Sequence, residues 1–159
     1  MPLTLEQLNK YVKADYSWED DLKLNRSPRS LSPELADAFE KSILPNVGDP
    51  KKNYLYYTLW TVISKSENKM VAGLLFTGEP NDAGEVEIGY GTEPQFQNNG
   101  YMTETIGGMV SWAKNQPDVR TIVAQTDQAN LPSHKTLLKN NFSKYKTVDP
   151  MIWWRLSTV

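Results

Sequence analysis

The sequence predicts an α+β fold, on the evidence of two patterns and of the chain's length. Runs dense in β-branched and aromatic residues, at 54–64, 70–77 and 85–92, are separated by turn residues at hairpin length and predict an antiparallel meander. Helical and strand patterns then alternate from about residue 103 onward, which is typical of strand–helix–strand crossovers. The length and the 39% hydrophobic content suit a single domain, 1–159, with a core of its own.

Two helices are predicted before the first strand. The segment Thr4–Gln7 has the residue types and spacing of a capping box, and the apolar residues that follow recur at helical spacing. A polar stretch, Ser17–Ser30, separates this helix from the next. Ser32-Pro33 has the residue types of an N-cap and a first helical position. We expect Leu44-Pro45 and the turn Gly48-Asp49-Pro50 to end the second helix.

The second half of the chain contains the remaining predicted elements. They are a helix at about Thr103–Asn115, a strand at Thr121–Asp127, a helix at about Pro132–Lys139, and strands near Lys144–Val148 and Met151–Ser157. In the last strand Trp153 and Trp154 are adjacent, so their side chains should point to opposite faces of the sheet. We expect one of them in the core.

The amino-acid composition excludes several kinds of chemistry. The chain has no cysteine and a single histidine, His134, so disulfides, thiolate nucleophiles and cysteine-based zinc sites are excluded. We therefore expect chemistry that needs no metal. Ser133 and His134 are neighbours, but adjacent helical residues point about 100° apart, which disfavours a serine hydrolase. We expect His134 to be exposed on its helix.

The charge balance limits the partners of the protein. With 17 basic and 19 acidic side chains the net charge is −2, so no global positive field would attract nucleic acid or an anionic membrane. No stretch has the roughly 20 apolar residues of a membrane span, and the first residues lack the pattern of a signal peptide. These features predict a cytoplasmic protein that binds any anionic ligand through local groups.

The segment 85–104 is the most informative part of the chain. It has the pattern of a strand, a polar loop and a helix start, and the free N–H groups of such a loop and helix end can bind a phosphate or pyrophosphate. An ordinary strand-to-helix connection is the alternative. The segment lacks the glycine spacing of a Walker loop and that of a dinucleotide fingerprint. This disfavours the common classes of nucleotide-binding protein.

Two blocks of this sequence resemble the GNAT N-acetyltransferase family. The segment Gln97–Met102 is similar to the acyl-CoA-binding motif Gln/Arg-x-x-Gly-x-Gly/Ala, with Met102 at a Gly/Ala position and Asn98 where glycine is usual. A second block, from Asn130 through Ser133 to Asn141-Phe142, resembles the family's Asn-x-x-Ser…Gly-Phe pattern. The strand before the first block resembles the branch that acetylates ribosomal-protein alanine N-termini and small amines.

The resemblance implies the GNAT fold, with splayed central strands flanked by helices, and a residue set for acetyl-CoA. It implies an acetyl-CoA-binding core at 85–142 and a helical acceptor-side region at 1–53. Backbone groups of Tyr90, Gly91 and Thr92 would bind the pantetheine amides, and Asn130 and Ser133 would also contact the cofactor. The pyrophosphate would be held by the loop and the helix start, formed by Gln97, Asn98, Asn99, Gly100, Tyr101, Met102 and Thr103.

Glu87 is the candidate general base. Strand alternation places it with Gly89 and Gly91 on one face of a mostly buried strand, where desolvation would raise the pKa of its carboxyl toward a useful value. The alternative is a solvated strand glutamate. The resemblance implies that Ser133 donates a hydrogen bond to the leaving sulfur, because Leu137 occupies the position of the usual tyrosine; the alternative for Ser133 is a local helix cap.

These observations predict an N-acetyltransferase that moves the acetyl group of acetyl-CoA directly to a primary amine. The alternative is a CoA-binding domain with little or no transferase activity. The acceptor could be a small-molecule amine or a peptide N-terminus, and the protein a monomer or a homodimer, because residues 11–60 do not choose among acceptors.

Overall fold

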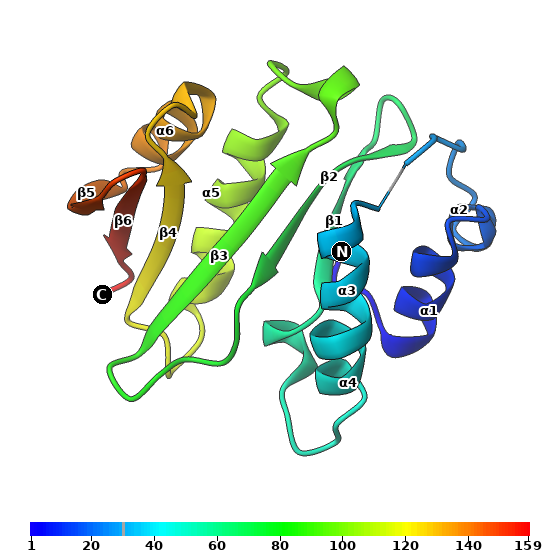
Figure 1. The fold of residues 1–159 in the computed structure, drawn as a ribbon, viewed down its shortest axis with the longest axis horizontal. Coiled ribbons are helices and arrows are strands. Elements are labelled where there is room, and N and C mark those ends of the chain that lie inside the picture. Colours follow the sequence, from blue (N-terminus) through cyan, green and yellow to red (C-terminus); the bar gives the residue numbers. More distant parts are fainter. Residues whose placement is uncertain (30) are drawn as a thin grey trace. The chain divides into compact units, whose positions relative to one another are not determined.

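A computed structural model describes residues 1–29 and 31–159 of the chain (Figure 1). Ser30, the last residue of the predicted polar stretch, lies outside the described residues. The chain divides into two compact units, Met1–Leu75 and Phe76–Val159. The candidate site belongs to the second unit, so the first is described only briefly.

The first unit contains a group of helices and an antiparallel pair of strands. Its elements are α1 (Leu5–Lys13), α2 (Ser17–Asp21), α3 (Pro33–Ala38), η1 (Phe39–Ile43), α4 (Leu44–Val47), η2 (Tyr54–Tyr56), β1 (Leu59–Ser64) and β2 (Lys69–Phe76). The predicted capping box of α1 is confirmed. The Gln7 N–H donates to Thr4 Oγ1 at 3.3 Å, and the Thr4 N–H donates to Gln7 Oε1 at 2.9 Å.

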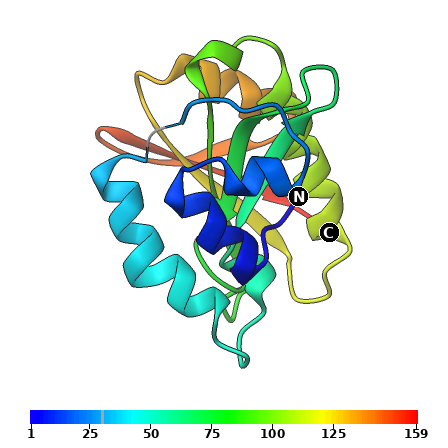
Figure 2. The ribbon, with the colours of Figure 1, turned by 90° about the vertical axis from the view of Figure 1, so that its right-hand side faces the viewer.

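The second predicted helix begins where expected and ends at the second of its two expected stop signals. Ser32 Oγ accepts a hydrogen bond from the Leu35 N–H at 3.1 Å, which confirms the N-cap. The helix continues past Leu44-Pro45, so the proline does not end it, and it ends at Val47, directly before the expected turn at Gly48-Asp49-Pro50 (Figure 2). The π turn η1 ends at Ile43, two residues before Pro45, and this wider turn accommodates a residue that has no N–H to donate.

The predicted strand at 54–64 is shorter than expected. Only Leu59–Ser64 forms β1, because the preceding residues form the 3₁₀ turn η2. Asn53 Oδ1 accepts a hydrogen bond from the Leu55 N–H at 3.2 Å and thereby favours the turn over an extended backbone. The aromatic content of 54–58 predicted a strand, but this local side-chain-to-backbone hydrogen bond stabilises a turn there instead.

A buried ion pair lies beside the core of the first unit. Glu19 of α2 and Arg29 are both almost fully buried and form a salt bridge. The guanidinium of Arg29 also lies 4.2 Å from the ring centroid of Tyr11 and donates a hydrogen bond to the Tyr11 carbonyl at 2.9 Å. The sequence showed only a polar stretch here, since a buried charge is recognised only when its partners are in place.

The second unit contains four strands of the mixed sheet and two longer helices. Its elements are β3 (Glu85–Thr92), η3 (Pro94–Phe96), α5 (Tyr101–Lys114), β4 (Thr121–Asp127), α6 (Leu131–Lys139), β5 (Ser143–Val148) and β6 (Met151–Ser157). β3 and β4 are parallel, and β6 pairs antiparallel with both β4 and β5 (Figure 1). The predicted strands and helices of this unit are confirmed to within two residues at each end, and η3 is a short turn within the expected polar loop.

One face of this sheet is buried and the other is open. Val86 and Ile88 of β3 are buried on the same side as Trp154 of β6, which is fully buried and donates a hydrogen bond from Nε1 to Thr126 Oγ1 at 2.8 Å. Trp153 points to the other side, where the ammonium of Lys146 lies 4.8 Å from its ring centroid. The predicted alternation of the two tryptophans is therefore confirmed.

His134 is buried, contrary to the expectation that it would be exposed. Only 9% of its surface is accessible. Its Nε2 lies 3.0 Å from the Asp127 carbonyl oxygen, and its ring packs 5.4 Å from the ring of Trp154. The side chain therefore fastens the start of α6 to the end of β4. The expectation of an exposed side chain was wrong because the sequence does not show which face of this helix meets the sheet.

None of the described helices is long and apolar enough to cross a membrane.

Asn141 provides a test of the backbone after α6. Its φ of +66° is in the left-handed region, where asparagine is tolerated better than alanine and glycine is unstrained. We expect Asn141→Ala to lower the free energy of unfolding by about 1 kcal/mol and Asn141→Gly to leave it within about 0.5 kcal/mol. Urea unfolding measures both. Equal losses in the two variants would show that the side chain, and not the backbone conformation, matters.

Candidate active site

The parallel strands β3 and β4 separate part-way along their length. Their pairing extends from Glu85–Thr121 to Ile88–Ala124 and includes no later residue pair. Both strands nevertheless continue, β3 to Thr92 and β4 to Asp127. The last residues of β3 therefore have no partner on β4, and their polar backbone groups on this side need one. The predicted splay of the central strands is thus present.

A cavity of about 480 Å³ opens beside the separated strands. It is lined by the end of β3, the loop before α5, the first turn of α5 and one side of α6 along its length. Every residue predicted to bind the cofactor is among the lining residues, which include Tyr90, Gly91, Thr92, Gln97, Asn98, Asn99, Gly100, Tyr101, Met102, Thr103, Asn130 and Ser133. Sequence reasoning missed Phe96, Pro132, Lys135, Thr136 and Lys139.

The loop before α5 is held by its own amide side chains. Asn99 Nδ2 donates to the carbonyls of Phe96 and Gln97 at 3.1 and 3.2 Å, and Gln97 Nε2 donates to the Thr92 carbonyl at 3.3 Å. Gly100 is the N-cap of α5 and makes no side-chain cap. The N–H groups of the first helical turn are thus available to an anion, and the helix dipole favours negative charge there.

The departures from the family pattern fit this loop. Asn98 has a φ of +64°, so asparagine stands where glycine is usual and adopts the left-handed conformation that glycine would. Met102 is only 8% exposed and belongs to the buried side of α5. Its side chain therefore contributes mainly to packing beneath the helix. Neither residue introduces a charge or a buried polar group that would oppose a phosphate.

Two lysines supply the formal charges of the cavity. Among the described lining residues, Lys135 and Lys139 alone carry a full charge, and both are positive. They lie one turn apart on α6, and both side chains are exposed. No described acidic residue forms an ion pair with either of them. A chain of net charge −2 thus has a locally positive cavity.

Ser133 and Tyr90 form a pair of hydroxyl groups in the cavity wall. Tyr90 OH lies 2.8 Å from Ser133 Oγ, and Ser133 is only 9% exposed. Burial raises the pKa of Tyr90, and the hydrogen bond with Ser133 opposes part of this increase. The cap of α6 is Asn130, whose Oδ1 accepts from the Ser133 N–H at 3.3 Å. The side chain of Ser133 therefore does not serve as the helix cap.

Glu87 lies on the opposite face of the sheet from the Tyr90–Ser133 pair. Strand alternation directs it away from the cavity, and it does not line the described wall. Its carboxylate is half-buried and accepts a hydrogen bond from Gln125 Nε2 at 2.7 Å. The two predicted catalytic residues are therefore not side by side. The hydrogen bond between Gln125 and Glu87 was not predictable from the sequence, because the register of β3 and β4 was unknown.

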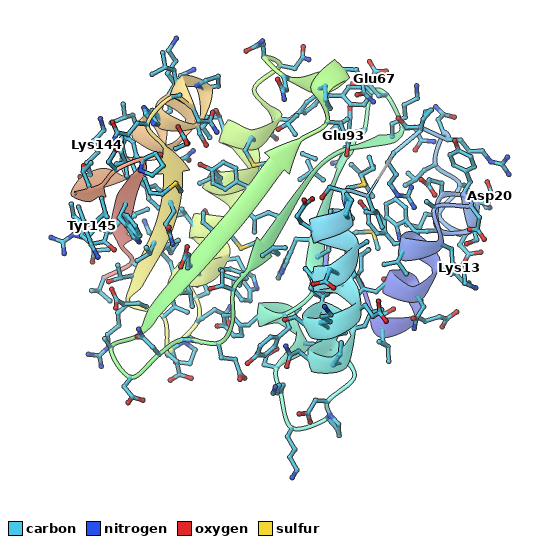
Figure 3. The ribbon with its side chains drawn as sticks, viewed as in Figure 1. Lys13, Asp20, Glu67, Glu93, Lys144 and Tyr145 are labelled. Atoms are coloured by element: carbon cyan, nitrogen blue, oxygen red, sulfur yellow. The ribbon has the colours of Figure 1, made fainter. Side chains whose placement is uncertain are left out.

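An outer tyrosine lies on β5, the edge strand of this unit's sheet. Figure 3 shows Tyr145 and its neighbour Lys144 on that strand. Burial raises the pKa of Tyr145, and the negative charges of Glu85 and Glu87 add to this effect. The guanidinium of Arg155 lies 5.1 Å from its ring centroid and opposes the increase. The face that carries Glu87 therefore has mixed charges.

The comparisons with known proteins identify the family. Residues 2–143 match the family described as "Acetyltransferase (GNAT) domain". The chain belongs to the GNAT acetyltransferase family. It is 34% identical over 83 residues to the uncharacterized N-acetyltransferase YjdG of Bacillus subtilis (strain 168). That alignment spans 52% of this chain and 49% of the relative, so the chain matches about half of the relative's length.

Solved structures confirm the predicted fold. The ribosomal-protein-S5-alanine acetyltransferase of Vibrio fischeri has a TM-score of 0.68 at 15% identity, covering 99% of this chain and 91% of that one. Campylobacter jejuni N-acetyltransferase PseH, solved in complex with acetyl coenzyme A, has a TM-score of 0.65 at 14% identity, covering 99% and 97%. The α+β GNAT fold and the family membership predicted from two short blocks are thus confirmed.

Gly100 provides a test of the anion-binding loop. Its φ is +78°, and a Cβ at this position would meet no atom within 4 Å, so Gly100→Ala acts through backbone strain alone. We expect the strained loop to bind CoA about fivefold more weakly, measured by titration calorimetry.

Gly108→Ala is the matched control for this experiment. Gly108 lies in the same helix, and a Cβ there also meets no atom within 4 Å. Alanine in a helix interior should raise the free energy of unfolding by about 0.5–1 kcal/mol and leave the CoA affinity unchanged. If both variants bind CoA as the unmodified protein does, the conformation of Gly100 has no role in binding.

Proposed function

We propose that this protein transfers the acetyl group of acetyl-CoA to a primary amine in a ternary complex, without a covalent enzyme intermediate. The observation that carries the proposal is the cavity beside the separated strands. It brings unpaired strand backbone, a helix N-terminus and two lysines together around one space. These groups fit, in turn, the amides of a pantetheine arm, a pyrophosphate and additional phosphate charge.

The cofactor residues follow from this arrangement. Backbone groups of Tyr90, Gly91 and Thr92 would hydrogen-bond the pantetheine amides, as they have no partners on β4. The loop from residue 97 and the first turn of α5 to residue 103 would hold the pyrophosphate through N–H groups. Acetyl-CoA supplies an activated acyl group, and the residues of the chain position it. This positioning is expected to provide most of the rate acceleration.

The two faces of the sheet suggest separate tasks for the two catalytic candidates. Ser133 faces the cavity and would donate a hydrogen bond to the leaving sulfur. Glu87 lies on the open face and would accept the ammonium proton of the acceptor, directly or through water. The reacting carbon would lie in the gap between the separated strands. Backbone N–H groups near Tyr90 would polarise its carbonyl.

The acceptor is proposed to be a peptide N-terminus or a small-molecule amine. The structural relative from Vibrio fischeri is named for an alanine of ribosomal protein S5, which favours a peptide N-terminus as the first probe. A half-buried Trp153 and the carboxylate of Glu87 on the open face suit an acceptor that is both cationic and partly apolar.

The absence of cysteine allows a direct test of the function. A thiol reagent mixed with this protein and acetyl-CoA detects only CoA released by turnover. We expect acetyl-CoA to raise the melting temperature and to release thiol with at least one member of a panel of amines and peptides with free N-termini. A raised melting temperature with no thiol release across the panel would favour the alternative, a CoA-binding domain. No change in melting temperature would exclude both.

Replacement of Glu87 tests the general base. We expect Glu87→Gln to lower kcat about 100-fold and to leave the Kd for CoA unchanged, because Glu87 is outside the cavity. The matched control is Glu85→Gln, two residues earlier on the same face, whose carboxylate bonds to Asn81 Nδ2 at 3.2 Å. Steady-state kinetics over a pH series measures both variants. A pH profile identical to that of the unmodified protein would exclude Glu87 as the base.

A further inference from the structure

Two hydroxyl groups from distant parts of the chain meet in the cavity wall. Tyr90 comes from β3 and Ser133 from the first turn of α6, 43 residues later, and their oxygens are 2.8 Å apart. Both residues line the cavity. The resemblance to the family implies only a backbone role for Tyr90, so its side chain has no part in the function proposed above.

The position of the pair corresponds to the reacting end of the cavity. The anion-binding loop and helix start form one part of the wall, at residues 97–103. From there the wall follows β3 backward through Thr92 and Gly91 to Tyr90. Tyr90 lies two residues beyond Ile88, the last residue that pairs with β4. A pantetheine arm bound by its pyrophosphate at the loop would therefore reach the Tyr90–Ser133 pair with its sulfur end.

The chemistry of the two groups indicates the direction of their hydrogen bond. A phenol is more acidic than an aliphatic alcohol, so Tyr90 is the better donor and Ser133 Oγ the better acceptor. The Ser133 N–H already donates to Asn130 Oδ1, which fixes the serine backbone at the helix start. With Tyr90 donating to Oγ, the serine proton is free to point into the cavity.

We propose that Tyr90 is a positioning residue that acts through Ser133 on the leaving sulfur. This inference rests on the proposed function. As the nitrogen lone pair of the amine forms the new C–N bond, the C–S bond breaks and its electron pair stays on sulfur. Ser133 donates a hydrogen bond to that sulfur, and Tyr90 holds and polarises Ser133. The ammonium proton goes to Glu87 or water, and neither hydroxyl loses its proton.

The burial of Tyr90 supports this role. It raises the pKa of the phenol, so the phenol stays protonated at alkaline pH, where a thiol ionises. Tyr90 can therefore donate its hydrogen bond in the state in which the sulfur carries negative charge. The two hydrogen bonds, from Tyr90 to Ser133 and from Ser133 to the sulfur, polarise each other, and each is stronger in this partly buried wall than in water.

The test measures the ionisation of the CoA thiol bound to the protein. Because the chain has no cysteine, the only thiol in the complex belongs to CoA. Ultraviolet absorbance of the thiolate is followed against pH, and the same titration of the protein without CoA is subtracted to remove the tyrosine signal. The proteins compared are the unmodified chain, Tyr90→Phe, Ser133→Ala and the double variant.

We expect the unmodified protein to favour the bound thiolate about three- to tenfold over Tyr90→Phe, which moves the midpoint to higher pH in the variant. The double variant should match Ser133→Ala, because Tyr90 acts only through the serine. In turnover with the best acceptor, Tyr90→Phe should have a lower kcat than the unmodified protein and an unchanged KM for acetyl-CoA. Tyr54→Phe, which changes an exposed tyrosine of the first unit, is the matched control and should alter neither measurement.

The outcomes separate this inference from the proposed function. If CoA binds and Tyr90→Phe leaves the thiol midpoint unchanged, the pair serves packing only and the inference is overturned, while the proposed function stands. Effects of Tyr90→Phe and Ser133→Ala that add in full in the double variant would show that the tyrosine acts independently of the serine, and would also overturn it. If CoA does not bind the unmodified protein, the proposed function and this inference fall together.

Discussion

The separation of β3 from β4 after the Ile88–Ala124 pair is the constraint on which the rest of the site depends. Two parallel strands normally satisfy each other's backbone N–H and C=O groups. Where one strand continues without its partner, these groups need hydrogen bonds from another source. Here the unpaired end of β3 forms one wall of the cavity, with the α5 start and α6 forming the others. An extended ligand with amides of its own can replace the missing strand.

The same separation gives the site access to both faces of the sheet. On the side covered by α5 and α6, Tyr90 and Ser133 meet and two lysines provide positive charge. On the open side Glu87 accepts a hydrogen bond from Gln125. In the proposed reaction, a proton acceptor and a hydrogen-bond donor would thus act on opposite sides of one reacting carbon.

Local features of this structure were predictable from the sequence because neighbouring residues determine them. The capping box at Thr4–Gln7 and the bounds of β3 and β4 depend on residue types over a few positions. The loop at Gln97–Met102 was recognised through its resemblance to a family motif, and two of its residues, Asn98 and Gly100, adopt the left-handed backbone that asparagine and glycine tolerate. The cavity wall could be listed in advance apart from a few residues, chiefly those on the outer turns of α6.

The sequence by itself determined the fold class, which follows from short-range periodicity, and the family, which two short blocks of residues indicated through their resemblance to known members. The tertiary structure decided what depends on partners distant in the chain. It buried His134 against Trp154, placed Glu87 and Ser133 on opposite faces, and joined Tyr90 to Ser133. No local pattern contains these relations, because strand register and the inward face of a helix are fixed only when the sheet and its helices pack together.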